Sequence, residues 1–288
     1  MRDSFVLNVI AQDAEDLASR LRTLGVPRWL SPVTAFDIPF AGDARAVLNE
    51  AQRLAAGAAA DINVVGAEGR KKKLLVSDME STIIDCECLD ELASIAGIGS
   101  KIAAITERAM RGEIAFEGAL RERVGLLKGL PLSALDQVWR ERVHLIPGAK
   151  ELVATMKANG THTVLVSGGF TYFAVRVAQA AGFDDYRSNV LNDDGVALTG
   201  TVGEPILGRE AKLEALERSL AKLGLQSSQA LAVGDGANDL AMIRRAGLGV
   251  AYHAKPVVAA GAGASIAHND LRALLYLQGY RDEEIVST

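Results

Sequence analysis

Cysteine is scarce in this sequence, where Cys86 and Cys88 are the only two among 288 residues. They stand one residue apart with no histidine nearby, so neither a disulfide framework nor a closed zinc site is expected. We therefore expect a reducing, cytoplasmic environment.

Basic residues are fewer than acidic ones. The sequence has 31 Lys and Arg and 36 Asp and Glu, which gives a net charge of −5, and no basic run is longer than Arg70 to Lys73. Nucleic acid and anionic membrane surfaces are not expected partners.

Long apolar runs are missing as well. The longest stretch without a charged residue, 158–175, contains Asn159, Ser167 and several glycines, which excludes a membrane span. The N-terminal residues MRDSFVLNVIAQDAED lack the apolar segment and cleavage site of a signal peptide. The chain has 49% hydrophobic and 23% charged residues, which is an ordinary globular composition. Its length allows two domains, or one domain with an insertion.

The first 66 residues are predicted to form a small α+β domain. Apolar runs at 5–10, 33–38 and 62–65 alternate with helical patterns at 14–24 and 43–59, which is typical of a compact α+β unit. The following GAEGRKKK is polar, glycine-bearing and basic, as linkers usually are. We place a domain boundary there, with 67–288 as the second domain.

The second domain is predicted to be α/β, with a doubly wound parallel sheet. Four compact apolar runs, KLLVSD, TVLVSG, ALAVGD and LGVAY, are separated by amphipathic helical stretches, which favours buried parallel strands. Between the first two runs, at about 86–145, helix formers dominate. That stretch is too long for one crossover helix, so we expect a helical cap inserted there. Asp194-Gly195 between apolar runs predicts a β-hairpin.

Acidic and phosphate-binding residues follow three of these predicted strands. The carboxyl ends of parallel strands meet at one edge of the sheet, and there the sequence places Asp78, Glu80, Ser167, Gly168, Asp235, Asn238 and Asp239. Converging carboxylates repel one another unless a cation neutralises them, and an all-oxygen ligand set selects Mg²⁺. Because Mg²⁺ in such sites commonly shares a phosphate, and because Ser167 and Gly168 could receive an anion, phosphate chemistry is the leading hypothesis. Lys212 could add a fixed positive charge.

Each of these residues has a simpler interpretation. An aspartate after a strand is often a turn former or helix cap, and a helical lysine such as Lys212 usually faces solvent. Their ordered coincidence at three strand ends favours a site over independent turns. The GDGAND segment lacks the third glycine of a dinucleotide fingerprint, and no GxxxxGK[ST] segment is present, so nucleotide-binding motifs are not supported.

The ordered set DMEST, SGG, Lys212 and GDGAND resembles the haloacid dehalogenase superfamily of aspartyl-phosphate phosphatases. Within it, DMESTIIDCECLDELA, FEGALRERVGLLKGLP, LVSGGFTYFA and AVGDGANDLAMI resemble the phosphoserine phosphatase family over about residues 73–277. The first 66 residues are only loosely similar to the regulatory-type domain of longer bacterial members. The resemblance implies hydrolysis of O-phospho-L-serine to serine and phosphate, in serine biosynthesis.

The resemblance also implies roles for the strand-end residues. Asp78 would be the nucleophile, and Mg²⁺ would be held by Asp78, the backbone carbonyl of Glu80 and Asp235, supported by Asp239 and Asn238. Ser167, Gly168 and Lys212 would hold the phosphoryl oxygens. The family usually has aspartate where this chain has Glu80, the acid expected to protonate the leaving oxygen and then to activate water. The extra methylene requires a different rotamer to reach the same oxygen.

The predicted cap would select the substrate. In FEGALRERVGLL, Arg123 shares a helical stripe with Phe116, Leu120, Val124 and Leu127, so it interrupts an apolar face. It either reaches solvent or, as the resemblance implies, binds the substrate carboxylate. The resemblance aligns Glu87 with the acid that pairs with the substrate ammonium group, and Met110 and Phe116 with apolar residues that close the pocket or form cap core.

Three other interpretations remain open at this stage. A phospho-receiver domain also uses a strand-end aspartate, but it has no cap and no acid equivalent to Glu80. A related phosphotransferase would pass the phosphoryl group to an alcohol such as homoserine. The N-terminal domain could sense an amino acid, or it could serve a structural role such as formation of a homodimer.

Overall fold

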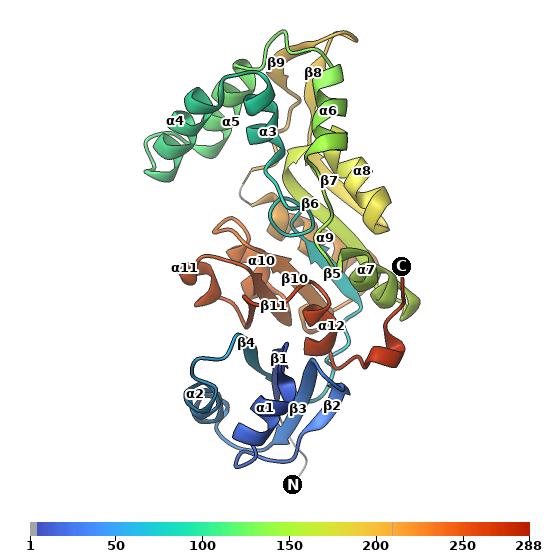
Figure 1. Ribbon diagram of the computed structural model, residues 1–288. Coiled ribbons are helices and arrows are strands. Elements are labelled where there is room, and N and C mark those ends of the chain that lie inside the picture. Colours follow the sequence, from blue (N-terminus) through green and yellow to red (C-terminus); the bar gives the residue numbers. More distant parts are fainter. Residues whose placement is uncertain (1–4, 209) are drawn as a thin grey trace.

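The computed structural model describes residues 5–208 and 210–288, except for the side chain of Met110. The elements form three tiers (Figure 1): an antiparallel sheet with two helices at the bottom, a six-stranded parallel sheet in the middle, and four helices with a two-stranded hairpin at the top. In the described part of the chain, no helix is long and apolar enough to cross a membrane.

The N-terminal tier is a four-stranded antiparallel sheet in the order β2-β3-β1-β4, with strands β1 (Phe5–Ala11), β2 (Arg28–Ser31), β3 (Ala35–Phe40) and β4 (Ala60–Gly66). Helices α1 (Ala14–Arg20) and α2 (Ala44–Leu54) pack on it through a buried cluster that includes Leu7, Leu17 and Phe36. The predicted α+β unit is confirmed, but β2 was not predicted. Its sequence, RWLS, lacks an apolar run, and its first two residues are exposed.

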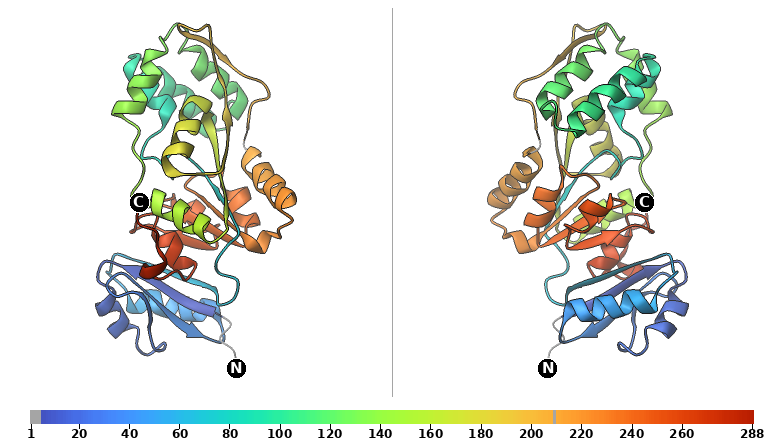
Figure 2. Two further views of the ribbon diagram at one scale, coloured as in Figure 1. Left: turned by 90° about the vertical axis from the view of Figure 1, so that its right-hand side faces the viewer. Right: turned by 90° about the vertical axis from the view of Figure 1, so that its left-hand side faces the viewer.

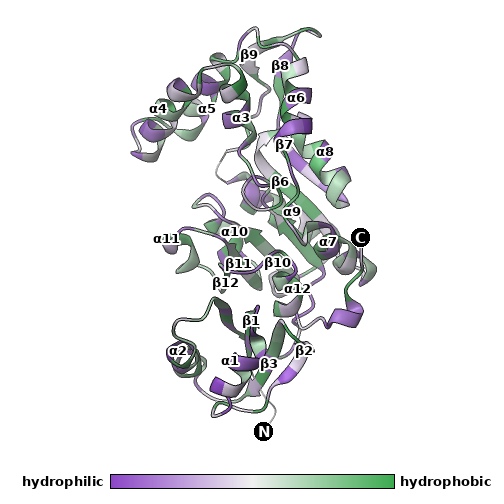
Figure 3. Ribbon diagram, in the orientation of Figure 1, coloured by the Kyte–Doolittle hydropathy of each residue, from purple (hydrophilic) through white to green (hydrophobic). Residues whose placement is uncertain are grey.

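The middle tier is a parallel sheet in the order β12-β11-β10-β5-β6-β7. Its strands are β5 (Leu74–Ser77), β6 (His162–Phe170), β7 (Asp185–Asn189), β10 (Ala230–Gly234), β11 (Leu248–Tyr252) and β12 (Ala264–Ile266). The four predicted strands are all present, and the central ones are strongly hydrophobic (Figure 3). Alternate residues of β5 enter different buried clusters, Leu75 on one face and Leu74 and Val76 on the other. Both faces are therefore covered, as the continuous apolar runs predict.

Helices lie on both sides of this sheet (Figure 2). They are α7 (Ala149–Ala158), α8 (Thr171–Ala181), α9 (Ala211–Leu223), α10 (Leu240–Arg245), α11 (Pro256–Ala259) and α12 (Ala273–Leu277), with short 3-10 turns at Ser227–Gln229 and Asp282–Glu284. The doubly wound α/β class is confirmed.

The top tier is the cap. It contains α3 (Cys88–Ile95), α4 (Gly99–Met110), α5 (Phe116–Gly125) and α6 (Ser133–Glu141). The predicted hairpin, β8 (Leu191–Asp193) and β9 (Leu198–Val202), is confirmed, and it joins the cap rather than the sheet. Gly129 N donates to Leu198 O at 2.8 Å, and Leu198 N donates to Leu130 O at 2.9 Å. The cap is thus built from two separate parts of the sequence.

Side chains join the edge strand β4 of the N-terminal sheet to the edge strand β12 of the parallel sheet. The Asn63 amide donates to Ser265 O at 3.0 Å and accepts from Ser265 N at 2.8 Å, so it imitates a strand-to-strand pair. Asp61 accepts from Ala267 N at 2.7 Å and from the Asn269 amide at 2.7 Å. These bonds fix the two sheets against each other.

Candidate active site

The three segments that carry the predicted site residues meet at one edge of the parallel sheet. Strands β10, β5 and β6 are neighbours, so the residues that follow them come together at their carboxyl ends. Carboxylate oxygens of Asp78, Asp235 and Asp239 all lie within 4.8 Å of one another. The sequence-based prediction that these three acids converge is therefore confirmed as geometry.

Lys212, from the first turn of α9, lies between two of these acids. Its Nζ is 2.6 Å from Asp78 Oδ1 and 2.5 Å from Asp239 Oδ1, and its side chain is only 6% exposed. Burial raises the pKa of Asp78 above its ordinary value, and the Lys212 ammonium opposes this by favouring the carboxylate. Burial by itself lowers the pKa of Lys212, but the charges of Asp78 and Asp239 outweigh burial and raise it. Lys212 does not face solvent; it supplies the fixed charge.

The GDGAND turn is shaped to hold Asp239 inside the protein. A Cβ at Gly234 would lie 2.3 Å from Asp239 Cγ, so only glycine fits there. Asp239 Oδ2 accepts from Gly236 N at 2.9 Å. Asp235 is less buried, and burial followed by the charge of Asp239 raises its pKa to about 6. Acids placed so closely that the charge of one raises the pKa of its neighbours fit a hard divalent cation, as Asp239 does for Asp78 and Asp235.

Glu80 is held between the cap and the sheet. Its Oε1 accepts from Cys88 N at 2.8 Å, and its Oε2 accepts from Ser167 Oγ at 3.4 Å. Ser81 has a left-handed φ of 55°, which turns the chain sharply after Glu80. A Cβ on Gly169 would lie 2.8 Å from Glu80 Oε2, so this glycine makes room for the longer acid. Burial, and then the charge of Glu87, raises the pKa of Glu80 to about 7.

The Ser167-Gly168 segment is held by a residue that the sequence analysis missed. Asn189, at the end of β7 and 2% exposed, donates to Gly168 O at 2.8 Å and accepts from Leu207 N at 2.7 Å. It therefore joins the Ser167-Gly168 loop to the segment that leads into α9. The only sequence signal for this role was a single asparagine next to apolar residues in the segment SNVL. Strand β7 itself was not predicted.

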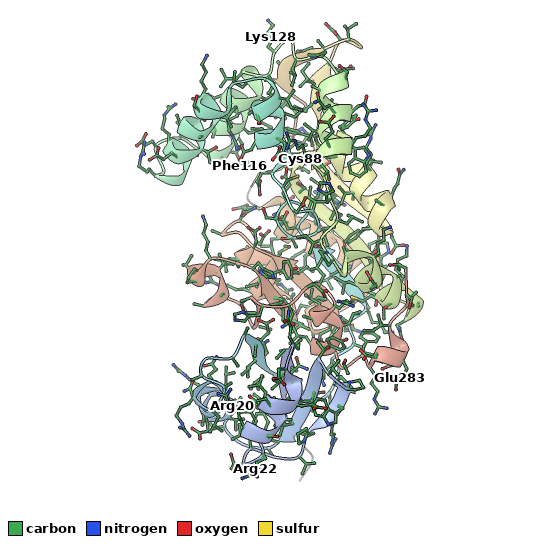
Figure 4. All side chains as sticks on the ribbon, in the orientation of Figure 1. Arg20, Arg22, Cys88, Phe116, Lys128 and Glu283 are labelled. Atoms are coloured by element: carbon green, nitrogen blue, oxygen red, sulfur yellow. The ribbon has the colours of Figure 1, made fainter. Side chains whose placement is uncertain are left out.

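Phe116 of the cap reaches this loop. Its ring lies 3.5 Å from the position that a Cβ on Gly168 would take. Together with Ser167, Lys212 and Asn238 it lines a small cavity of about 30 Å³. Figure 4 shows Phe116 and Cys88 on the side of the cap that faces the parallel sheet.

Arg123 of α5 is partly buried, while Leu120, Val124 and Leu127 of the same stripe are buried as predicted. Its Nε donates to Ala119 O at 3.4 Å, and it forms no ion pair within the described residues. Burial lowers the pKa of Arg123, while Asp90, Glu80 and Glu87 favour its charged form. The guanidinium is therefore available to an anion.

The remaining predicted residues are placed as follows. Glu87, at the start of α3, is exposed and accepts from Ser81 Oγ at 2.8 Å. Asn238 is exposed beside the cavity. The side chain of Met110 lies outside the described part. Cys86 and Cys88 are free thiols, and Cys88 is fully buried, in agreement with a packing role. The backbone amide of Cys88, which binds Glu80, was not foreseen.

Comparisons with known proteins agree with this arrangement. The sequence profile of the haloacid dehalogenase-like hydrolases matches residues 72–247. A phosphoserine phosphatase from Albidiferax ferrireducens is 49% identical over 211 residues, which cover 71% of this chain and 89% of that protein. One from Haemophilus influenzae is 46% identical over 209 residues, covering 73% of this chain and 66% of that protein.

Solved structures show the same similarity. A haloacid dehalogenase family hydrolase from Salmonella enterica serovar Typhi has a TM-score of 0.86 at 29% identity and covers 96% of this chain and 98% of its own. A probable phosphoserine phosphatase from Vibrio cholerae has a TM-score of 0.80 at 31% identity, covering 96% and 87%. With the profile matching more than half of its residues, this chain belongs to the haloacid dehalogenase-like hydrolase family.

Proposed function

We propose that this chain is a phosphoserine phosphatase that hydrolyses O-phospho-L-serine to L-serine and phosphate. The observation that carries the proposal is a partly buried arginine, Arg123, without an ion-pair partner in the described structure, on the cap above an aspartate paired with a buried lysine. Relatives that are 42–49% identical and named phosphoserine phosphatase support the choice of substrate.

Asp78 is proposed as the nucleophile. A carboxylate is ordinarily ionised at neutral pH and needs no activating base, and the Lys212 ammonium favours that form of Asp78 against the effect of burial. Attack of its oxygen on phosphorus forms an aspartyl-phosphate and breaks the bond to the serine oxygen. Ser167 Oγ, the Gly168 amide and Lys212 hold the phosphoryl oxygens, the kind of fixed positive environment on which phosphoryl transfer depends.

The proposed metal is Mg²⁺. Asp78 and Asp235 would hold it with the backbone carbonyl of Glu80, while Asp239 supports the site by anchoring Lys212. When bound, Mg²⁺ supplies positive charge that offsets the carboxylates and the phosphoryl group. The hard-oxygen donor set fits this ion.

Glu80 is proposed to move the protons. It gives a proton to the leaving serine oxygen and later takes one from the water that hydrolyses the aspartyl-phosphate. A pKa of about 7 suits both steps, because the group is then partly protonated and partly ionised near neutral pH.

The cap is proposed to recognise the amino-acid part of the substrate. Arg123 binds the carboxylate, Glu87 binds the ammonium group, and Phe116 closes the apolar side, a role that the family resemblance also gives to Met110. We further propose that residues 1–66 form a separate regulatory-type domain, that 67–288 form the phosphatase domain with its cap at about 86–145, and that the enzyme acts in the cytoplasm.

The deciding experiment is a panel of small phosphomonoesters assayed with and without Mg²⁺. We expect Mg²⁺-dependent release of phosphate, strongest with phosphoserine. Equal turnover of phosphoserine and an achiral phosphomonoester would contradict the substrate assignment while leaving the family intact. Asp78→Asn should abolish both turnover and trapping by beryllium fluoride. Addition of homoserine separates hydrolysis from phosphotransfer, since a transferase would release less phosphate when that acceptor is present.

A further inference from the structure

A second cavity, of about 630 Å³, lies between the N-terminal sheet and the parallel sheet. Its lining includes Lys72, Ser228, Gly247 and Gly263. Each of these residues lies one or two positions before the start of a parallel strand. The cavity is therefore at the amino-terminal edge of the sheet, opposite the catalytic aspartates. Its volume is in the range of metabolite pockets, about 300–1,000 Å³.

Much of the cavity wall is bare backbone. Six of the lining residues are glycines, namely Gly66, Gly69, Gly247, Gly249, Gly261 and Gly263. At Gly66 the nearest atom to an added Cβ would be 4.0 Å away, and at Gly69 nothing would lie within 4 Å. A ligand can therefore approach the main chain closely at this end of β4 and in the connection that follows it.

Lys72 is a buried cation in this wall without a carboxylate partner. It is 8% exposed, and its Nζ donates to Gly69 O at 2.8 Å and to Ser228 O at 2.9 Å. Both acceptors are neutral, and an ammonium group has a third donor, for which the described residues provide no acceptor. Burial lowers the pKa of Lys72, which reflects the cost of burying an unbalanced charge. An anion beside Nζ would offset that cost.

The other charged groups leave the cavity positive. Arg70 is neutralised by Asp37, with which it forms a bidentate pair. Arg244 lies against Gly261, donates from Nε to its carbonyl at 3.4 Å, and has no ion pair in the described structure. Glu68 is the one carboxylate among the described lining residues. With Lys72 and Arg244 against Glu68, the net charge of the wall favours an anion.

From these observations we propose that the cavity binds a small metabolite carrying a carboxylate or phosphate group. The site is distinct from the catalytic one, and the proposal does not depend on the identity of the substrate. A ligand there touches β4 of the N-terminal sheet, the connection at Gly69 to Lys72, and the turns before β11 and β12. It would thus bridge the two sheets at the start of β5, the strand that Asp78 directly follows.

The test uses two dianions of different shape, selenate for phosphate and malonate for carboxylates, titrated calorimetrically into the full chain. We expect saturable binding, tighter for the anion that matches the natural group. Arg244→Gln should weaken it about tenfold or more, as expected for loss of a charge-assisted contact. The matched control is Arg245→Gln, because Arg245 is also exposed on α10 but pairs with Glu217 at 2.7 Å outside the cavity.

A second matched pair is Lys72→Met and Lys73→Met. Lys73 is exposed and donates to Asn159 O at 3.1 Å, so only the Lys72 change should weaken binding. Anomalous scattering from selenate-soaked crystals should place the ion beside Lys72 Nζ. Absence of saturable binding by both anions, equal weakening by Arg244→Gln and Arg245→Gln, or selenate found only at the catalytic aspartates would overturn the proposal.

Discussion

Replacement of Lys212 by methionine tests whether the buried aspartates depend on this one cation. Methionine keeps most of the length of the lysine stem and removes only the charge. The Lys212 Nζ lies 2.6 Å from Asp78 and 2.5 Å from Asp239, whose side chains are 8% and 0% exposed. Without Lys212, two carboxylates remain buried with no counter-charge from the described protein residues that contact them.

The expected cost follows from this burial. Breaking a buried ion pair by removing one partner destabilises a protein by about 3–5 kcal/mol. At about 2–4 °C per kcal/mol for a domain of this size, Lys212→Met should lower the melting temperature of the metal-free protein by about 6–20 °C. The same residue should also be required for turnover, because it holds the phosphoryl oxygens in the proposed mechanism.

The cost should depend on pH in a defined direction. In the variant, burial and the negative charge of Asp239 raise the pKa of Asp78 in the folded state above the value of the unfolded chain, with no ammonium group to oppose them. The folded state then binds protons more tightly than the unfolded state, so its stability falls as pH rises, by up to about 1.4 kcal/mol per pH unit for each proton involved. The deficit relative to the parent should be larger near about pH 8 than near about pH 6.

Thermal and urea unfolding, followed by circular dichroism in EDTA and then in Mg²⁺, measure these effects. Mg²⁺ should stabilise the variant more than the parent, because it replaces the missing charge. Lys222→Met is the control on the same helix: Lys222 is 70% exposed and 3.5 Å from Asp185, and such surface pairs contribute about 0–1 kcal/mol. A Lys212→Met protein that melts with the parent in EDTA at both pH values would refute the counter-charge reasoning.

Substitutions at three further site residues can be tested by steady-state kinetics. Glu80→Gln should lose hydrolysis because it cannot exchange a proton, whereas Glu80→Asp, the usual family residue, should keep measurable activity; a Gln variant as fast as the parent would assign proton transfer elsewhere. Arg123→Ala should reduce kcat/KM for phosphoserine about a hundredfold, since a charge-assisted contact contributes about 1.5–3 kcal/mol, and should leave phosphoethanolamine, which lacks the carboxylate, nearly unchanged; equal losses on both would limit Arg123 to support of the cap. Asn189→Ala should raise KM for phosphoserine and weaken inhibition by inorganic phosphate in parallel, because the Gly168 loop loses the hydrogen bond that anchors it. An unchanged KM and an unchanged inhibition constant would show that the loop holds its position without Asn189.

The sequence predicted those strands of the parallel sheet that are buried along most of their length. Strands β5, β6, β10 and β11 are buried over nearly their whole length, so their apolar runs were visible. Strand β7, with three exposed residues, and β12, with three residues in all, gave no such run because edge strands need little apolar surface. They are held by pairing with β6 and β11, the strands that precede them in the sequence.

The same distinction applies to the site. Asp78, Asp235 and Asp239 were predicted because strand order in a parallel sheet brings their segments to one edge. Asn189 and the Cys88 amide were missed because their roles are hydrogen bonds across about twenty and about eight residues of chain, respectively, and neither leaves a periodic pattern. The burial of Lys212 could not be predicted from the sequence either, since the amphipathic α9 carries another lysine, Lys222, that is exposed.

The hairpin β8–β9 makes the cap a two-segment structure, and this limits how caps can be exchanged in evolution or by engineering. Leu191, Leu198 and Val202 of the hairpin are each less than 10% exposed, and Leu198 is paired through its backbone with Gly129 and Leu130. Excision of 86–145 alone would expose these side chains to water and leave their main-chain groups without hydrogen-bond partners. A transplant of the cap must therefore carry residues 191–202 with it, because the packing of the cap depends on two separate stretches of sequence.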